Sequence, residues 1–399
     1  MEAAPIATRP PTGTTAAPAP DQTGLWEPRY GMLDAWRGLA ALTVVVHHVS
    51  SQAALPFLAA YNVGHWAVML FFVISGYCIA VAADSCLRKG LSFRTFMWRR
   101  IRRIYPPYLL AVGYYSVTRV AKLVLTGEND LSTSSLQWVQ NLTLTQWVTL
   151  LVDPIPRAPD NPTNFVAAYW SLGYEEQFYL VIGLAMIAVA RTNRPLLVWV
   201  AGLMAVAVAW NLALPRLSVG LFIEYWAHFA VGVLVFYRLC RLQEARSRRW
   251  VDAVLLALLL GGAWIAWAAP EPWSGPEAKG AELLSVTAFG LLLIALRPAS
   301  DAVMASGVGR VLAGLGLLTY SLYLVHQCNL FLTAWVASLV VAPGWASLLL
   351  QLVLHVLLAV PFYYLCERPF HNKPLTPALA LPPHSLPGTT RAVAMPELT

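Results

Sequence analysis

The feature that most constrains this chain is a series of long apolar stretches. Each has about 18 to 22 predominantly apolar residues, the length that an α-helix needs to cross about 30 Å of hydrocarbon. Only 12% of the residues are charged, whereas about a quarter are charged in a soluble domain. The sequence therefore predicts an all-α, polytopic membrane protein with about ten transmembrane helices and excludes a soluble globular one. The predicted spans are 37–57, 63–83, 105–124, 169–190, 196–214, 220–237, 250–268, 281–296, 311–336 and 345–365.

The positions of the basic residues predict how the chain is oriented. With the N-terminus inside, the arginine-containing loops 84–104, 191–195, 238–249 and 297–310 all lie inside, and the outside loops are poor in Lys and Arg. This is the bias that the positive-inside rule describes. The formal net charge of +7 is therefore assigned to membrane topology rather than to a nucleic-acid partner. We expect both termini in the cytoplasm, a multi-pass location in the cell membrane, and membrane lipid around the helices.

The two ends of the chain differ in composition from its apolar centre. Residues 1–29 are rich in Pro, Ala and Thr and lack the basic, apolar and cleavage regions of a signal peptide. Residues 373–399 have a similar composition. Such segments bury too little apolar surface to fold. We predict two disordered cytoplasmic tails that flank a membrane domain at 30–372.

Two connections between the predicted spans have features of their own. Residues 125–168 form the longest outside loop, which is long enough for a lid or a substrate-binding element. The inside segment 93–107 combines apolar residues at helical spacing with several arginines, and it ends in Pro106 and Pro107. We predict an interfacial amphipathic helix that these prolines terminate.

Arg37 and His48 are ionisable side chains in the first predicted span. Such residues are costly inside a membrane and are therefore often functional. Eleven residues of an ideal helix give about 16 Å of rise and about 20° of net rotation, so Arg37 and His48 share a face, and His47 points about 80° away. A buried imidazole is a natural general base near neutral pH. The alternative is that His47 and His48 only form hydrogen bonds to neighbouring helices.

A second candidate site consists of the arginines that precede Pro106. Arg100 and Arg103 are three residues apart and face the same side of a helix. Guanidinium groups bind phosphates with paired hydrogen bonds, so these two residues are candidates for holding a phosphorylated cytosolic donor. The simpler interpretation is that they anchor the helix at the membrane interface.

The segment YWSLGYEEQFYL, residues 169–180, has two carboxylates just inside the fourth span. Glu175 and Glu176 point about 100° apart and so cannot share one role. Glu175 and Tyr179 lie one helical turn apart and are candidates for one wall of a polar cavity. The alternative is a carboxylate pair held at the level of the lipid headgroups.

Three weaker patterns have structural explanations. Ser75 and Gly76 form a small-residue pair that permits close helix packing. Glu224 and His228 lie one turn apart, but a pair without a third ligand is weak evidence for a metal. The five cysteines show neither paired nor metal-ligand spacing. No metal site is therefore predicted.

Several short motifs follow one another along the chain: LDAWRGLAALTVVVHH, FFVISGY, FMWRRIRRIYPPY, AAYWSLGYEEQFYL, FAVGVLVFY, YSLYLVH and ERPF. Together they resemble the acyltransferase-3 family of integral membrane acyltransferases, over about residues 30–372. The resemblance implies a ten-helix bacterial membrane domain that transfers an acyl group, usually acetyl, from coenzyme A to a hydroxyl. The implied acceptor is a carbohydrate or, in some members, a macrolide.

The resemblance also implies roles for particular residues. His48 and Glu175 would be catalytic, and Trp170 and Ser171 would bind the substrate. Tyr179 and His326 are further candidates for substrate binding. The family patterns that carry these roles fall on three sets of residues: Arg37 with His48, Arg100 with Arg103, and Trp170, Ser171 and Leu172 with Glu175. The three arginines among them would bind the donor.

The resulting hypothesis is O-acyl transfer from acyl-CoA, with His48 as general base and Glu175 orienting the imidazole or the sugar. No permanently bound cofactor is expected. A covalent acyl-histidine and a role for His47 are alternatives within this hypothesis, and the acceptor, the acyl group and the oligomeric state are open. A transporter or flippase with Glu175 and His48 in a proton relay is the alternative function, and a non-catalytic scaffold is a third.

Overall fold

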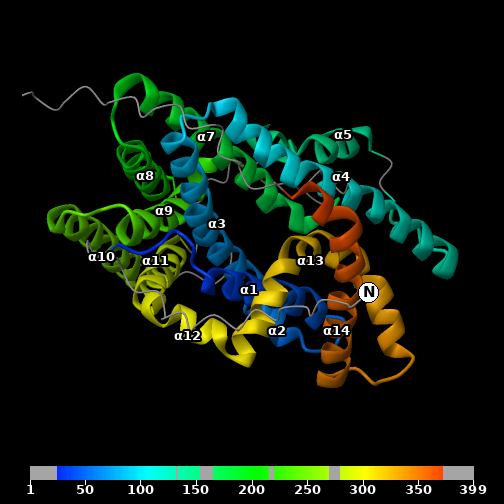
Figure 1. The fold of residues 1–399 in the computed structure, drawn as a ribbon. Coiled ribbons are helices and arrows are strands. Elements are labelled where there is room, and N and C mark those ends of the chain that lie inside the picture. Colours follow the sequence, from blue (N-terminus) through cyan, green and yellow to red (C-terminus); the bar gives the residue numbers. More distant parts are fainter. Residues whose placement is uncertain (1–24, 132–133, 153–164, 215–219, 269–278, 372–399) are drawn as a thin grey trace, which may run out of the picture.

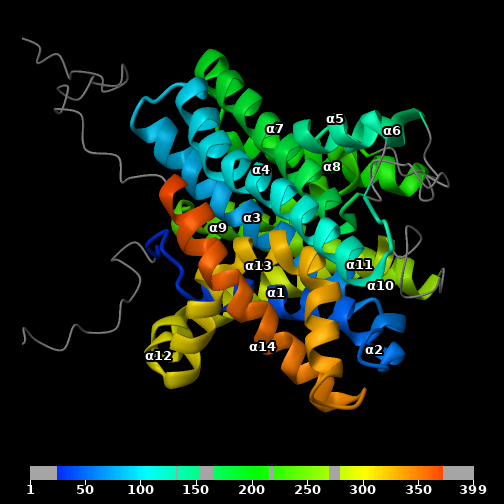
Figure 2. The same ribbon diagram turned by 90° about the vertical axis from the view of Figure 1, so that its right-hand side faces the viewer.

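The structure, a computed structural model, describes residues 25–131, 134–152, 165–214, 220–268 and 279–371. These residues form helices and contain no strand, which confirms the predicted all-α class. The long helices are α1 (Met32–Ser50), α3 (Val63–Arg88), α4 (Phe93–Thr126), α7 (Trp170–Thr192), α8 (Leu196–Ala213), α9 (Trp226–Cys240), α10 (Ala245–Ala268), α11 (Lys279–Leu296), α13 (Gly307–Ser338) and α14 (Trp345–Phe362). The shorter ones are α2 (Pro56–Ala60), α5 (Ser135–Thr143), α6 (Gln146–Val152) and α12 (Ser300–Ala305) (Figures 1 and 2).

Eight of the described helices are long and apolar enough to cross a membrane. They correspond to eight of the ten predicted spans, which confirms the polytopic class. The spans predicted at 37–57 and 220–237 fall on α1 and α9 and do not meet the same criteria. α1 is more polar, because its 19 residues include an acidic residue, an arginine and two histidines. α9 has only 15 residues, which rise about 22 Å.

The short helix α9 lies inside the bundle. Fourteen of its fifteen residues are buried, so it does not need the full length of a lipid-facing span. It crosses α3 closely, because a methyl group built on Gly76 would lie 2.0 Å from the Phe229 carbonyl oxygen. One built on Gly232 would lie 1.9 Å from the Val73 carbonyl oxygen. The close packing predicted for the Ser75-Gly76 pair is therefore present.

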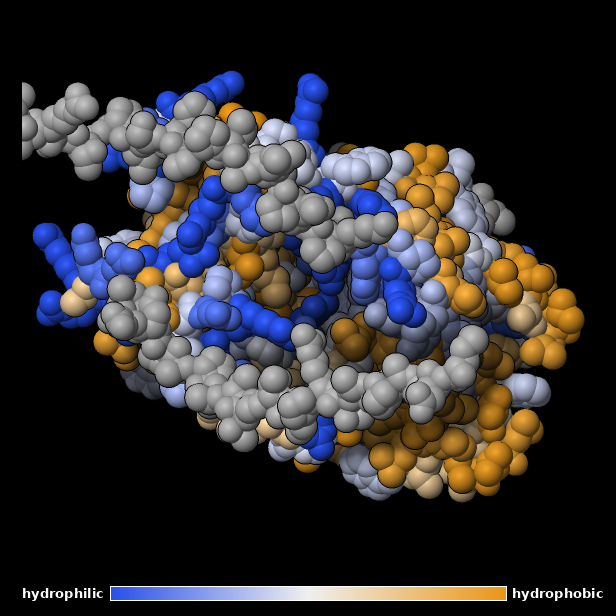
Figure 3. All heavy atoms as spheres, viewed as in Figure 1, coloured by the Kyte–Doolittle hydropathy of each residue, from blue (hydrophilic) through white to orange (hydrophobic). Residues whose placement is uncertain are grey.

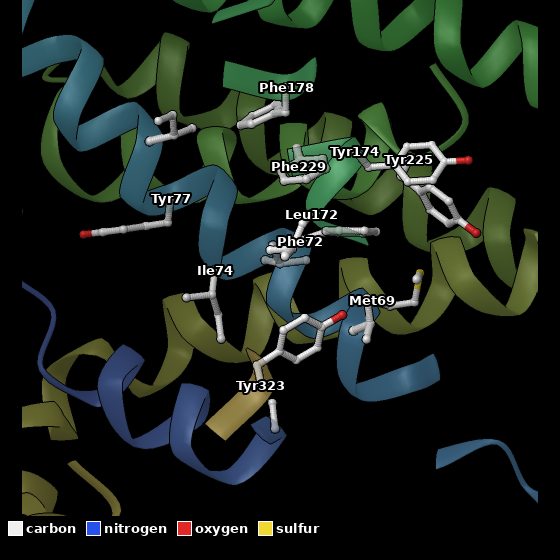
Figure 4. Close-up of a cluster of buried hydrophobic side chains, with 14 of the residues drawn as sticks. Met69, Phe72, Ile74, Tyr77, Leu172, Tyr174, Phe178, Tyr225, Phe229 and Tyr323 are labelled. Carbon is white, nitrogen blue, oxygen red and sulfur yellow. The ribbon is translucent and has the colours of Figure 1, made fainter. Parts of the chain in front are cut away.

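Aromatic side chains fill the space where α3, α7 and α9 meet (Figure 4). The rings of Phe178 and Phe229 stack with their centroids 3.9 Å apart, and Phe72 lies 4.6 Å from Phe229. Tyr174 and Tyr225 meet edge to face at 4.9 Å. Buried aromatic rings contribute large apolar areas and prefer such offset geometries. This layer holds α7 against α3 and α9 and so fixes the position of the acidic segment on α7.

α1 packs along α13, and α14 covers both of them (Figure 2). Glycines again allow the close approach: a methyl group on Gly316 would lie 2.2 Å from the Asp34 carbonyl oxygen. On α1, a methyl group built on Gly38 would lie 2.6 Å from the Leu312 carbonyl oxygen. The helix that carries Arg37 and the histidine pair is thus held directly against α13.

The prediction of a separate interfacial helix that stops at Pro106 and Pro107 is wrong. α4 continues through both prolines as one helix of 34 residues. A proline inside a helix removes a backbone hydrogen bond, but neighbouring helices can stabilise such a segment in a membrane bundle. Here the Tyr320 hydroxyl of α13 donates to the Ile104 carbonyl oxygen at 2.9 Å, which attaches this part of α4 to α13 without replacing the bonds that the prolines remove. The arginine-rich segment and the third predicted span are therefore parts of a single helix.

The predicted tails lie almost entirely outside the described residues. In the described part of the N-terminal segment, the Trp26 backbone nitrogen donates to the Leu239 carbonyl oxygen at 2.9 Å. Arg297 donates to the Arg29 carbonyl oxygen at 3.0 Å. These contacts attach the chain just before α1 to the ends of α9 and α11.

The long loop at 125–168 contains α5 and α6. Its described part is attached to α4, because the Tyr108 hydroxyl donates to the Asn141 carbonyl oxygen. Within the loop, Gln146 donates to the Asn141 side chain at 2.8 Å. Residues 132–133 and 153–164 of the loop lie outside the described residues, and its predicted role in substrate binding stays a prediction.

Candidate active site

A cavity lies between α1, α3, α4, α7 and α13. Its volume is about 150 Å³, which is room for about five water molecules at the density of the liquid. On the face seen in Figure 3, hydrophilic side chains surround a hollow near the centre of the molecule. The polar lining of the cavity consists of Arg37, Ser75, Arg100, Arg103, Ser171, Glu175, Tyr179, Thr319, Tyr320 and Tyr323.

The three arginines predicted to bind a donor all line this cavity. Arg37 comes from the first turns of α1, where it pairs with Asp34 at 3.6 Å between Nη1 and Oδ1. Arg100 and Arg103 come from the first half of α4. The Arg100 guanidinium lies 5.7 Å from the centre of the Tyr179 ring, and its buried Nε has no hydrogen-bond partner among the described residues. The cavity therefore presents three guanidinium groups to a ligand.

Glu175 lies in the same cavity, within hydrogen-bond distance of two hydroxyls. Its Oε1 accepts from Ser75 Oγ at 2.9 Å and from the Tyr179 hydroxyl. The neighbouring Glu176 instead accepts from the Tyr105 hydroxyl on α4. The two carboxylates thus face different helices, as their 100° separation predicts, and Glu175 is the one that lines the cavity.

Ser171 and Tyr323 form a hydrogen-bonded part of the cavity wall. Their hydroxyl oxygens are 2.6 Å apart, and the Tyr323 hydroxyl also donates to the Ala168 carbonyl oxygen. Ser171 Oγ is therefore the donor to the Tyr323 hydroxyl oxygen. The Tyr323 ring lies 5.7 Å from the ring of the buried His326, so this wall separates the cavity from a cluster of histidines.

His48 belongs to this histidine cluster, and among the described residues the cavity lining includes neither His48 nor His326. The two rings lie 5.1 Å apart. The Gln327 amide nitrogen lies 3.2 Å from His48 Nε2, and the Gln327 oxygen accepts from the Ala168 backbone nitrogen at 3.0 Å. The structure therefore brings His48 and Glu175 to neighbouring parts of the site without a direct contact between them.

His47 faces another helix. A methyl group on Gly64 of α3 would lie 2.8 Å from the His47 ring, so this ring packs directly on the start of α3. The rings of His47 and His48 are 5.0 Å apart at an angle of 73°. The two rings therefore face different helices, as their positions on the helix predict: His47 faces α3 and His48 faces α13.

Trp170 lies away from the cavity lining and stacks on His65. The two ring planes are 16° apart, with centroids separated by 6.4 Å. Trp170 also meets Phe72 and Tyr225 at 6.1 and 5.7 Å. Of the four residues predicted to bind substrate, Ser171 and Tyr179 therefore line the cavity, whereas Trp170 and His326 lie in neighbouring clusters.

Sequence reasoning missed several polar contacts of the site. Ser75 was assigned to helix packing, yet its hydroxyl binds Glu175. Tyr323 and Gln327 lie in or beside the motif YSLYLVH, and their contacts with α7 and α1 come from packing between distant helices. His65 had a usable signal, because it is an ionisable residue at the start of an apolar span.

The Glu224 and His228 pair makes contacts that differ from those of a metal site. Glu224 accepts from the Tyr174 hydroxyl at 2.8 Å, whereas His228 Nε2 lies 3.6 Å from Glu282. Within the part of the chain that the structure describes, no group of three or more His, Cys, Asp or Glu residues is suited to hold a metal ion.

The fold and the site define a multi-pass, all-α membrane protein with a cavity rich in arginine next to a histidine cluster. The family model of acyltransferase-3, described as an acyltransferase domain, matches residues 30–368. The chain therefore belongs to the acyltransferase-3 family, which confirms the resemblance carried by the sequence motifs.

Three curated relatives illustrate this similarity. O-acetyltransferase OatA of Staphylococcus aureus (strain NCTC 8325) is 24% identical over 177 residues, which are 43% of this chain and 27% of OatA. The putative peptidoglycan O-acetyltransferase YrhL of Bacillus subtilis is 32% identical over 154 residues, 37% of this chain and 22% of YrhL. An uncharacterized protein of Haemophilus influenzae is 31% identical over 124 residues, 30% of this chain and 47% of that protein.

Each of these matches covers less than half of the relative's own length. All three relatives are bacterial proteins. No solved structure matches the chain.

Proposed function

We propose that this protein is a bacterial membrane O-acyltransferase that transfers an acyl group, in the first place acetyl, from acyl-CoA to a hydroxyl of a carbohydrate. The observation that carries the proposal is the cavity in which Arg37, Arg100 and Arg103 lie together with Glu175. Membership of the acyltransferase-3 family supports the same reaction class.

In this proposal the arginines bind the donor. Coenzyme A carries several phosphate groups, and guanidinium groups bind phosphates through charge-assisted, paired hydrogen bonds. The arginines come from helix segments that the positive-inside rule assigns to the cytoplasmic side, where acyl-CoA is available. Acyl-CoA is a substrate here, and no permanently bound cofactor is invoked.

His48 is the proposed general base. It lies eleven residues beyond Arg37, which is about 16 Å along α1, a distance on the scale of a pantetheine arm. A His48 nitrogen accepts the proton of the acceptor hydroxyl as the oxygen bonds to the thioester carbonyl carbon. The carbon–sulfur bond then breaks, and the imidazolium returns the proton to the thiolate, so that an ester and free CoA are formed. Tyr323, whose hydroxyl bonds Ser171 in the cavity wall, would have to move aside for the thioester to reach His48.

Glu175 then has a different role from the one expected. Since its Oε1 accepts from Ser75 and Tyr179, it orients the cavity side chains rather than the His48 imidazole. In this position it also lowers the net positive charge that the arginines create. Ser171 and Tyr179 supply hydroxyls to the part of the donor that enters the cavity.

The proposed acceptor class is a cell-envelope carbohydrate. Two of the relatives are named O-acetyltransferases, one of them a putative peptidoglycan O-acetyltransferase. Such an acceptor is presented on the outer side of the cell membrane, so the helices must join an inner donor site to an outer acceptor site. The cell membrane is accordingly the proposed location.

The direct test uses purified protein in detergent with acetyl-CoA labelled in the acetyl group and glycan strands from bacterial cell walls. We expect label on the glycan and an equal amount of free CoA. Detergent provides no second compartment, so a transporter or flippase would release no CoA. Absence of free CoA would therefore reject the proposal.

His48→Ala and His47→Ala test the choice of base in the same assay. We expect His48→Ala to lower acetyl transfer at least about 100-fold, the lower range for loss of general base catalysis. His47→Ala should retain transfer, because its ring faces α3. Unchanged transfer by His48→Ala at equal protein abundance would remove His48 from the mechanism.

A further inference from the structure

A second polar cluster lies at the opposite end of α3 from its cytoplasmic end. His65 Nε2 is 2.7 Å from Glu282 Oε1 on α11. Glu282 is fully buried, with Lys279 Nζ 3.8 Å and His228 Nε2 3.6 Å from its Oε2. A buried carboxylate in a membrane-spanning helix is costly and is by default a candidate for function.

Glu282 determines the hydrogen-bonding character of His65. A carboxylate only accepts hydrogen bonds, and the Lys279 ammonium is a cationic neighbour of this carboxylate. His65 Nε2 must therefore carry the proton in this contact, and in the neutral ring Nδ1 keeps its lone pair. The same arrangement, a carboxylate that fixes the tautomer of an imidazole, orients the histidine of hydrolytic triads.

His65 is the histidine in the part of the chain described by the structure with the shortest contact to a carboxylate. His48 has the Gln327 amide as its nearest polar partner, and His371 lies 3.3 Å from Glu367. No described residue is hydrogen-bonded to His65 Nδ1, and 14% of the His65 side chain is exposed. An oriented hydrogen-bond acceptor is thus left free for a ligand.

The position of His65 fits the acceptor side of the proposed reaction. It lies ten residues from Ser75, which is about 15 Å along α3, and Ser75 binds Glu175 in the arginine cavity. The next residue before it, Gly64, packs against the His47 ring. His65 is therefore at the depth of the histidine pair, on the side of the bundle away from the arginines.

Aromatic side chains flank this imidazole. Trp170 stacks on the His65 ring, and Trp66 meets the same ring edge to face, with the ring centroids 5.9 Å apart. Trp170 itself is partly exposed. Aromatic rings beside oriented hydrogen-bonding groups suit a ligand that has both apolar faces and hydroxyls, which is the chemistry of a sugar.

We propose that His65, oriented by Glu282 and flanked by Trp170, is an acceptor-binding residue whose Nδ1 accepts a hydrogen bond from a hydroxyl of the carbohydrate. This subsite rests on the proposed function and adds the acceptor side to it. Glu282 is a positioning residue, because it acts through His65. The alternative is that the contact between His65 and Glu282 only joins α3 to α11. This structural role makes the opposite prediction for two substitutions of His65.

The two substitutions separate the nitrogens of His65. In His65→Gln the amide nitrogen lies near the position of Nε2, so the bond to Glu282 is kept and the Nδ1 acceptor is lost. In His65→Asn the amide oxygen lies near the position of Nδ1, so the acceptor is kept and the bond to Glu282 is lost. A binding role therefore predicts a larger loss of transfer in His65→Gln, and a structural role predicts a larger loss in His65→Asn.

The measurement is the ester-linked acetate that mild alkali releases from the envelope of cells expressing each variant, normalised to the protein in the membrane. Thermal unfolding of the purified variants and their affinity for acetyl-CoA are measured in parallel. We expect about a tenfold decrease for His65→Gln, the loss of one hydrogen bond to a buried site. We expect a decrease of less than about threefold for His65→Asn, and wild-type affinity for acetyl-CoA in both.

The outcomes are distinguishable. If wild-type protein adds no ester-linked acetate, the proposed function fails and this subsite falls with it. If wild-type protein adds acetate but His65→Gln matches it, or if His65→Asn is the weaker and less stable variant, the function stands and the subsite is rejected. Weaker binding of acetyl-CoA by His65→Gln would assign His65 to the donor and also overturn the proposal.

Discussion

At the scale of single residues, the arginine cavity is the most direct link between sequence and chemistry. Arg100 and Arg103 share a helix face by their spacing, and Arg37 reaches the same cavity from another helix. Interface anchoring does not require three guanidinium groups around one hollow. Under the proposed function, they converge to bind a ligand that carries phosphate groups.

We predict that Arg100→Ala and Arg103→Ala each weaken binding of acetyl-CoA by about ten- to 100-fold. Loss of one hydrogen bond to a charged group costs about 1.5 to 3 kcal/mol, and 1.4 kcal/mol corresponds to a factor of ten. The measurement is isothermal titration of the purified protein with acetyl-CoA.

Arg102→Ala is the matched control for these variants, because Arg102 belongs to the same helix and is absent from the described lining of the cavity. It should bind acetyl-CoA as the wild type does. Equal losses in all three variants would indicate a general effect of charge and would argue against a specific donor site.

Residue-level contacts between distant segments were the part of the site that the sequence could not predict. Helical periodicity relates only residues of one helix, and so it grouped Glu175 with Tyr179 and separated His47 from His48. The bond from Ser75 to Glu175 joins positions 100 residues apart, and that from His65 to Glu282 joins positions 217 apart. Such pairs depend on how the helices pack.

At the scale of the elements, close helix crossings determine where these side chains lie. α3 and α9 approach so closely that only glycine fits at Gly76 and Gly232. The same helix α3 carries Ser75 into the arginine cavity. A change in this crossing therefore alters the site as well as the stability of the bundle.

Gly76→Ala should destabilise the protein by about 1 to 3 kcal/mol, the usual cost of overpacking a core. The added methyl group would meet the Phe229 carbonyl oxygen at 2.0 Å, which is backbone and cannot turn aside. Gly202→Ala on α8 is the control, because a methyl group there meets nothing within 4 Å. Thermal unfolding in detergent compares the two, and equal midpoints would contradict the close crossing.

The element-level predictions failed where tertiary packing overrides a local rule. Pro106 and Pro107 are strong local signals for the end of a helix, yet α4 runs through them and is held by Tyr320. The apolar pattern predicts an ordinary lipid-facing span at 220–237. The observed α9 lies inside the bundle, where a helix of 15 residues is long enough.

At the scale of the whole molecule, the proposed reaction needs a donor site toward one side of the membrane and an acceptor site toward the other. The arginines belong to the side assigned to the cytoplasm, and His65 with Glu282 lies toward the other side. The apolar pattern was sufficient to predict the class of fold, because this class follows from the bilayer rather than from details of packing. The orientation rests on the loop charges and stays a prediction.

Single cysteines test this orientation. We predict that a membrane-impermeant maleimide labels Ala342→Cys in intact cells, because the loop charges assign its loop between α13 and α14 to the outside. Lys89→Cys, in the loop between α3 and α4, should be labelled only after the membrane is permeabilised. The wild type measures the background from its own five cysteines, and labelling of Lys89→Cys in intact cells would reverse the topology.

The central claim is that one membrane domain passes an acyl group from a donor on one side to an acceptor on the other. Its most direct test is a proteoliposome that contains only this protein, with cell-wall glycan strands trapped inside and labelled acetyl-CoA added outside. We predict label on the enclosed glycan and free CoA in the outer solution, both lost in His48→Ala. Label that appears only when donor and glycan are on the same side would contradict the claim.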